Sequence, residues 1–127
     1  MSRLYKRSSK KAGASPGTLV YVGEKTAEKV KISILNYDAG QYEEKEIKSI
    51  EEAFVGGSKP AVSWINIDGL HQIDILEKIG AHFNIHPLVL EDILNTRQRP
   101  KMEAYDDHIF VVLKMLQFDR NGTAIEA

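Results

Sequence analysis

The sequence predicts an α/β (α+β) domain in which helices pack on a mixed β-sheet, arranged as an α/β/α sandwich. Segments of strand-like apolar pattern are interleaved along the chain with segments of helical period, which is the order expected of such a domain. The chain has 127 residues, of which 43% are hydrophobic, so it is long enough for one domain with a core. It contains no cysteine, which excludes disulfides and thiolate metal sites.

Charge divides the chain into a basic start and an acidic body. Residues 1–12 hold 5 of the 17 basic residues and none of the 18 acidic ones, which leaves 12 basic against 18 acidic residues in the remainder. We expect residues 1–18 to be a basic flexible tail, free or in contact with anionic lipid head groups, and residues 19–127 to be the domain. The total charge of −1 argues against a nucleic-acid binder. No apolar run approaches the roughly 20 residues that span a bilayer.

The first third of the chain predicts three strands. A short strand is expected at Thr18–Tyr21, and the alternation from Val30 to Ile34 predicts a half-buried strand. Residues 38–40 supply a turn. The chain then returns antiparallel over residues 42–48, which carry so many Glu and Lys side chains that we expect a solvated edge strand.

A short helix and a buried strand come next. Ser49 and Glu52 have the spacing of a capping box, and the helix that they begin is expected to end at residues 56–57. Residues 61–67 show little polar alternation, which predicts a strand covered on both faces. Trp64 is therefore expected in the core, where Trp64→Ala would cost about 3–5 kcal/mol.

Two helices follow the buried strand. Apolar residues recur at spacings of three and four over residues 72–84, which predicts an amphipathic helix. The second helix is expected over residues 86–95, because Pro87 suits the first helical position and Pro100 closes the segment after it.

Glu91 and Asp92 lie off the apolar stripe of the second helix, so we expect them to face solvent or a partner. Both lie toward the C-terminal end, where the helix dipole disfavours each anion by a few tenths to about 1 kcal/mol. A cation is expected to offset this charge. The candidates are the basic side chains of Arg97, Arg99 and Lys101 and a bound divalent cation.

The last part of the chain predicts a short strand at residues 102–105 and the best strand of the sequence at residues 109–118. We expect residues 109–113 in the core. Asn121-Gly122 is the strongest short hairpin signal, but only residues 124–127 remain to form the returning strand. We therefore expect a C-terminally truncated part of a longer protein, whose last five residues are poorly ordered or pair with another chain and whose last long strand presents an unprotected edge.

Other polar residues offer weaker sites. His82 and His86 are four residues apart but separated by a helix boundary, so ordinary polar or capping roles compete with a zinc site as the interpretation. Asp68 follows a buried strand and, with His71 or His108, would be the site of a small enzyme. A turn that ends the strand is the competing interpretation of Asp68. The sequence contains neither a phosphate-binding glycine loop nor a nucleophile elbow.

Several blocks of sequence then stand in a recognisable order, namely Trp64–Leu70, Ile75–Gly80, His86–Asn95, Gln98–Lys101 and Phe110–Met115. With Val20–Gly23 and the strand from Lys29, they closely resemble the N-terminal cytoplasmic domain of the CorA magnesium and cobalt channels over roughly residues 18 to 120. The Gly-Met-Asn pore signature, the two transmembrane helices and the long stalk helix of that family are absent from this sequence.

The resemblance implies a homopentameric channel for Mg2+, with Co2+ and Ni2+ also passing, in the inner membrane of a prokaryote. This chain would lie on the cytoplasmic side, would not be an enzyme, and would have as partners the neighbouring identical subunits and the missing stalk and transmembrane segments. In relatives, the carboxylate matching Asp92, aided by that matching Glu91, meets an Asp on the neighbouring subunit's stalk helix. Together they hold regulatory Mg2+, or Co2+, and favour the closed state.

Several alternatives to this function remain open in the sequence. They are a zinc-exporting relative in the same superfamily, a stand-alone α/β interaction module, and the small enzyme described above. For Glu91 and Asp92, the alternative is a solvated or salt-bridged face. Because two carboxylates leave most of the coordination shell to water, we expect the isolated domain to bind Mg2+ weakly.

Overall fold

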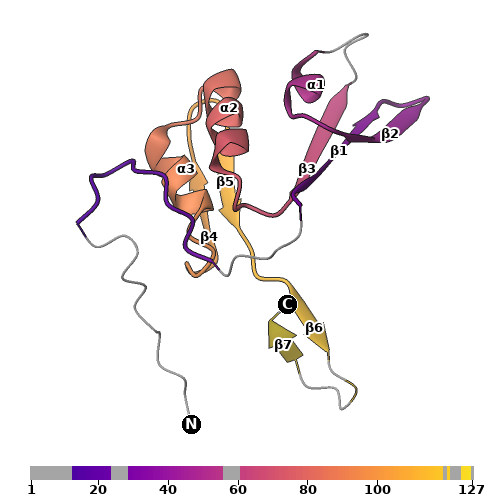
Figure 1. Cartoon of the computed structure of the whole chain (residues 1–127). Helices are drawn as coiled ribbons and strands as arrows, with labels where there is room; N and C mark the ends of the chain where they lie inside the picture. The colour runs from indigo at the N-terminus through magenta and orange to yellow at the C-terminus, as the bar shows by residue number, and fades with distance from the viewer. Residues whose placement is uncertain (1–12, 24–28, 56–60, 119, 121–123, 127) are drawn as a thin grey trace. The chain divides into compact units, whose positions relative to one another are not determined.

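The structure is a computed structural model that describes residues 13–23, 29–55, 61–118, 120 and 124–126. The chain divides into two compact units, Met1–Thr96 and Arg97–Ala127 (Figure 1). Both strands and helices are present, which confirms the α+β class. None of the helices in the described residues is long and apolar enough to cross a membrane.

The first unit contains a three-stranded antiparallel sheet in the order β2-β1-β3. Its strands are β1 (Lys31–Tyr37), β2 (Tyr42–Ile47) and β3 (Val62–Asp68). The predicted turn joins β1 to β2, because Asp38 Oδ1 accepts the N–H groups of Gly40 and Gln41 at 2.8 and 3.0 Å. β2 is an exposed edge strand, as predicted.

One face of this sheet, here called the inner face, forms the first core. Ile32 lies opposite Ile47 on one side and Ile67 on the other, so all three strands contribute to the same face. The buried members of this core are Ile32, Ile34, Ile47, Ile50 and Ile75. Each buried side chain of this size stabilises the fold by about 1.5–3 kcal/mol relative to an exposed one. The described helices of this unit therefore add one layer to the sheet.

The opposite, outer face of the sheet is exposed, and the expectation that β3 is covered on both faces is wrong for the described structure. Trp64 is 63% exposed and Val62 is 42% exposed. Trp64 lies opposite Leu35 of β1 and points away from the inner face, because side chains alternate along a strand. The placement of Trp64 in the core is thus corrected, and no second helical layer occurs among the described residues of this unit.

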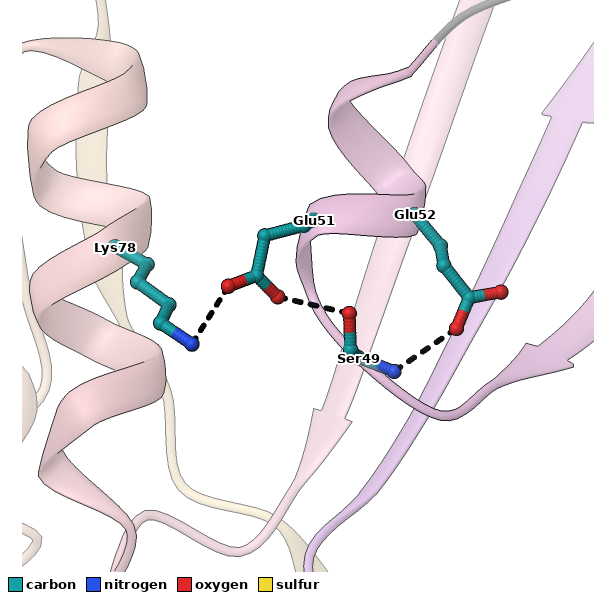
Figure 2. Close-up of polar contacts among 4 residues, drawn as sticks. All are labelled: Ser49, Glu51, Glu52 and Lys78. Atoms are coloured by element: carbon teal, nitrogen blue, oxygen red, sulfur yellow. Dashed lines mark hydrogen bonds and ion pairs between the residues drawn. The ribbon is translucent and has the colours of Figure 1, made fainter.

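The short helix α1 (Glu51–Phe54) begins with only half of the predicted capping box (Figure 2). Glu52 Oε1 accepts the backbone N–H of Ser49 at 3.1 Å. The Ser49 hydroxyl donates to Glu51 Oε2 at 2.8 Å, so it does not cap the N–H of Glu52. The predicted end of this helix, at residues 56–57, lies outside the described residues.

α1 is attached to α2 (Ile73–Phe83) by an ion pair and by stacked rings. Figure 2 shows the ion pair, in which Lys78 Nζ lies 2.6 Å from Glu51 Oε1. This hydrogen bond lowers the pKa of Glu51 from 4.5 to about 2 and raises the pKa of Lys78. The rings of Phe54 and His82 stack with their centroids 3.8 Å apart. His82 thus packs against α1, a role that the sequence did not predict.

The second core lies where α3 (Pro87–Ile93) packs on α2. It consists of the buried residues Leu76, Leu90 and Leu94. Gly80 allows the close approach, since a Cβ at that position would lie 2.4 Å from Leu90 Cδ1. Both predicted helices are confirmed, with boundaries within a few residues of those expected.

The second unit contains two separate antiparallel strand pairs. They are β4 (Lys101–Ala104) with β5 (Ile109–Val112), and β6 (Leu116–Phe118) with β7 (Ala124–Glu126). Within the described residues, the strands therefore form three antiparallel sheets, not the single mixed sheet that was expected. β7 pairs within the chain, which corrects the expectation of a disordered or intermolecular end at residues 124–126. The Asn121-Gly122 turn, Thr123 and Ala127 lie outside the described residues.

The long strand predicted at residues 109–118 is two strands. Residues 113–115 interrupt it between β5 and β6. The expectation that its first half is core is also wrong for the described structure, because Ile109 is 64% and Leu113 is 80% exposed. The apolar sequence identified a strand correctly but did not determine whether that strand is covered.

Candidate functional site

Glu91 and Asp92, the predicted metal ligands, both lie in α3 with partly buried side chains. His86 caps this helix, since its Nδ1 accepts the N–H of Leu88 at 3.1 Å. The capping interpretation of His86 is therefore correct. The buried face of α3 carries Val89 and Leu90, so the two carboxylates lie off that face, as predicted.

Glu91 is bonded to the segment that precedes the sheet. The backbone N–H of Gly17 donates to Glu91 Oε2 at 2.8 Å in a partly buried position. Gly17 has a φ of +83°, in the left-handed region that glycine adopts without strain. A Cβ at Gly17 would lie 3.5 Å from Pro87 Cβ, so the segment runs close against the start of α3. Glu91 is thus more engaged than the exposed carboxylate expected from the sequence.

Residues 13–23, here called the strap, are fastened to α3 and to the residues after it. The N–H of Val22 donates to the carbonyl of Leu94 at 3.0 Å, and Thr96 Oγ1 donates to the carbonyl of Val22 at 3.2 Å. Leu19 and Tyr21 pack against the second core. The strap is not a strand, which corrects the strand expected at residues 18–21. The tail boundary at residue 18 stays a prediction, although the contact of Gly17 with α3 lies before it.

The chemistry of the Glu91 and Asp92 carboxylates suits Mg2+, but two carboxylates alone do not fill its coordination shell. Mg2+ prefers oxygen ligands and is commonly held by one or two carboxylates with several waters retained. No group of three or more His, Cys, Asp or Glu side chains able to hold a metal occurs in the part of the chain that is described. Adjacent helical residues also diverge by about 100°. The residues therefore fit a weak site that needs further oxygen ligands from elsewhere.

The basic residues expected to balance the acidic pair belong to the second unit. Lys101 Nζ lies 2.9 Å from Glu103 Oε1 and 5.2 Å from the centre of the Phe110 ring. The hydrogen bond from Lys101 lowers the pKa of Glu103. Lys101 is thus used within its own strand pair, and the role assigned to Arg97 and Arg99 stays a prediction.

The alternative enzyme site is not assembled around Asp68. Asp68 ends β3, and its Oδ1 accepts the side-chain N–H of Asn66 at 3.3 Å. The next residue, Gly69, has a φ of +103°, which agrees with a turn that ends the strand. Among the described residues, no hydrogen bond joins Asp68 to His71. His108 belongs to the second unit, where it contacts Asp107 Oδ1 at 2.5 Å.

Sequence reasoning missed two features of the first unit. One is the Gly17–Glu91 contact, which joins residues 74 positions apart and has only the Pro-Gly pair at 16–17 as a local signal. The other is an open depression at the β1–β2 hairpin, lined by Leu35, Tyr37, Asp38, Ala39, Gly40, Gln41, Tyr42 and Glu44. The N–H groups of Gly40 and Gln41 lower the pKa of Asp38 there. This carboxylate is already bonded as the hairpin turn requires.

Comparison with known proteins places this geometry in context. A family described as "CorA-like Mg2+ transporter protein" matches residues 60–127. The Cobalt/magnesium transport protein CorA of Thermotoga maritima is 43% identical over 122 residues. That match covers 96% of this chain and 34% of the relative, so the chain spans about a third of the relative's length. The resemblance found in the sequence is confirmed, and the chain belongs to the CorA-like Mg2+ transporter family.

Proposed function

We propose that the chain is the cytoplasmic regulatory part of a Mg2+/Co2+ channel, in which Asp92 and Glu91 help to bind a divalent cation between subunits. Membership of the CorA-like family supports ion transport as the task of the whole protein. The observation that carries the regulatory role is the position of two partly buried carboxylates, Glu91 and Asp92, on a helix that is packed into a core. These carboxylates become a site when a neighbouring subunit supplies further ligands.

The packing of α3 gives the acidic pair a fixed position. Leu94, directly after the helix, is 0% exposed, and Val89 and Leu90 are also buried. A carboxylate on such a helix loses little conformational entropy when it meets a cation, because the backbone beneath it is already ordered. In this proposal the second core holds Asp92 in a fixed position, and a neighbouring subunit supplies the other ligands of the cation.

The regulatory effect follows from differential binding. Without a cation, carboxylates that meet across a subunit boundary repel one another. A divalent cation between them removes the repulsion and links the subunits. If this arrangement occurs in the closed channel and not in the open one, Mg2+ shifts the population toward the closed state.

In this proposal the partners are neighbouring identical subunits and the stalk and membrane segments of a longer protein. The chain spans 34% of the length of its Thermotoga maritima relative, which leaves room for such parts. The chain would lie on the cytoplasmic side of a prokaryotic inner membrane.

A chimera tests the proposal. This chain would replace the matched region of the Thermotoga maritima protein, and Mg2+-dependent protection from trypsin would be measured. We expect Asp92→Ala to raise the Mg2+ concentration for half-maximal protection on the order of tenfold, because removal of a metal-site contact typically costs 10–100-fold in affinity. Ion selectivity should not change, because it belongs to the pore.

Glu77→Ala is the matched control, since it removes one exposed carboxylate from the neighbouring helix α2. It should leave the protection midpoint unchanged. Undiminished protection in the Glu91→Ala, Asp92→Ala double variant would show that the pair is an ordinary acidic surface and that sensing lies elsewhere.

A further inference from the structure

The outer face of the sheet is hollowed at the β1–β2 hairpin. The depression has a volume of about 630 Å³, which lies within the roughly 300–1,000 Å³ of small-molecule sites. The residues that line it include an aliphatic side chain, two tyrosines and two carboxylates, namely Leu35, Tyr37, Tyr42, Asp38 and Glu44. Because the depression is open, a ligand there keeps part of its surface in water.

The strand register brings two rings and one carboxylate to the same face. Tyr37 lies directly opposite Tyr42, and Leu35 lies opposite Glu44 in the next outward-facing pair. Residues that lie directly opposite each other have Cβ atoms about 4.5–5.5 Å apart. A ligand in the depression therefore meets aromatic rings, an aliphatic side chain and a carboxylate together.

The fold does not use the polar and aromatic surfaces of these side chains. Tyr42 is 77% exposed and Tyr37 is 40% exposed. Among the described residues, neither ring stacks on another ring, and the Glu44 carboxylate has no hydrogen bond or ion pair. Two ring faces and one carboxylate are thus available to a ligand.

The charge around the hairpin is negative. Residues 37–46 contain four acidic residues and one basic residue, Lys45. Lys45 lies opposite Ile34, so it belongs to the inner face and not to the depression. Hydrogen bonds from backbone N–H groups of the turn lower the pKa of Asp38, which is therefore charged at neutral pH. The depression attracts a cation.

We propose that this depression binds a small organic cation, a guanidinium or ammonium group on an apolar stem. A guanidinium group stacks on the tyrosine rings, since such cations are weakly hydrated and attracted to aromatic faces. The Glu44 carboxylate pairs with the charge, and the apolar stem lies against Leu35. Mg2+ is a poor occupant, because it retains its waters and prefers oxygen ligands, which ring faces do not supply.

Titration of the 127-residue chain with butylguanidinium, monitored by 1H–15N NMR, tests the site. We expect shifts confined to the amides of residues 35–44 and a Kd on the order of millimolar, as a few exposed contacts would give. Butylurea, the uncharged isostere, should bind at least about fivefold more weakly. Equal binding of the two compounds would mean that the contact is merely apolar and that the proposal is wrong.

Variants of β2 assign the contacts. Tyr42→Ala should weaken binding about threefold to fivefold, whereas Tyr42→Phe keeps the ring and should stay within about 1.5-fold. Glu44→Gln should weaken binding about twofold to fivefold. The matched control is Glu46→Gln, which removes the next outward-facing carboxylate of β2 but does not line the depression. It should stay within about 1.5-fold at about 0.15 M salt, because salt screens exposed charges.

The remaining outcomes would overturn the proposal. Equal losses in Glu44→Gln and Glu46→Gln would show a diffuse attraction to an acidic surface and no site. Unchanged binding in Tyr42→Ala, with the amide spectrum otherwise intact, would exclude a role for the rings. If acetyl-Gly-Arg-Gly-amide binds more than about tenfold more tightly than butylguanidinium, the depression takes an arginine side chain of a partner protein and not a free cation. None of these outcomes alters the proposed function, which does not use the hairpin.

Discussion

Both faces of the β2-β1-β3 sheet carry apolar side chains, but the two faces differ in how far those side chains are buried. Ile32 and Ile34 on the inner face are each 4% exposed, whereas Trp64 on the outer face is 63% exposed. The inner face is covered by α1 and α2, and none of the described residues of this unit forms a helix over the outer face. The apolar residues of a strand show that one of its faces can be buried. Which face is buried depends on the helices that pack on the sheet.

The largest expected effect is on the inner face. Ile34→Ala should lower the free energy of unfolding by about 2–5 kcal/mol, because it removes buried methyl groups and leaves a cavity. Urea melts monitored by circular dichroism would measure this loss. Leu35→Ala is the control, since Leu35 is the next residue of β1 and points to the outer face. Equal losses for the two variants would mean that the outer face is covered in solution.

On the outer face, truncation of a larger side chain should lower the free energy of unfolding by less. We expect Trp64→Ala to cost less than about 1 kcal/mol, because most of its side chain is exposed and surface substitutions usually have small effects. The same urea melts test this value. A loss of about 3–5 kcal/mol, as the sequence alone suggested, would place Trp64 in a core.

The smallest expected effect is at the margin of the covered face, where Glu51 and Lys78 join α1 to α2. The pKa of Glu51 is lowered from 4.5 to about 2 by the hydrogen bond from Lys78. A lowered pKa in the folded state contributes stability that is present above the ordinary pKa and is lost as the pH falls through the folded value. The thermal midpoint of Glu51→Gln should therefore lie below that of the unaltered chain above pH 4.5, and the difference should shrink as the pH approaches 2.

Lys78→Met provides the control for this pair. It should reproduce the pH dependence, and the double variant should lose no more than either single variant, because each removes the same interaction. A difference that persists at a pH near 2 would show that ionisation of Glu51 is not the source of the effect.

The local sequence pattern predicted the helices and strands well, but it predicted the burial of their side chains poorly. The period of residues 72–84 and the prolines around residues 86–95 determined two helices, since these signals act within a few residues. The burial of Trp64 and Ile109 depends on segments far away in the sequence, which periodicity does not contain. The run from Ile109 to Phe118 also failed as one strand, because the apolar pattern does not mark the interruption at residues 113–115.

In the candidate site too, the features with local sequence signals were predicted and a contact between distant residues was missed. Glu91 and Asp92 were identified from their unfavourable place on a short helix, and the structure puts both in α3. The contact between Glu91 and Gly17 was missed, because a backbone donor 74 positions away leaves no periodic signal. A glycine that follows a proline marks a turn but not the residue that the turn will meet.

The strap also imposes an order on folding. Its attachments at Glu91 and Thr96 each close a loop of 74 positions, with an entropic cost on the order of 4 kcal/mol beyond a constant. The β1–β2 hairpin and the α2–α3 pair close much shorter loops, so they can form before the strap docks. During synthesis the strap leaves the ribosome before α3 does, and its docking site is complete only after residue 96 has emerged. The strap is therefore made before its docking site and is among the last segments to reach its native place.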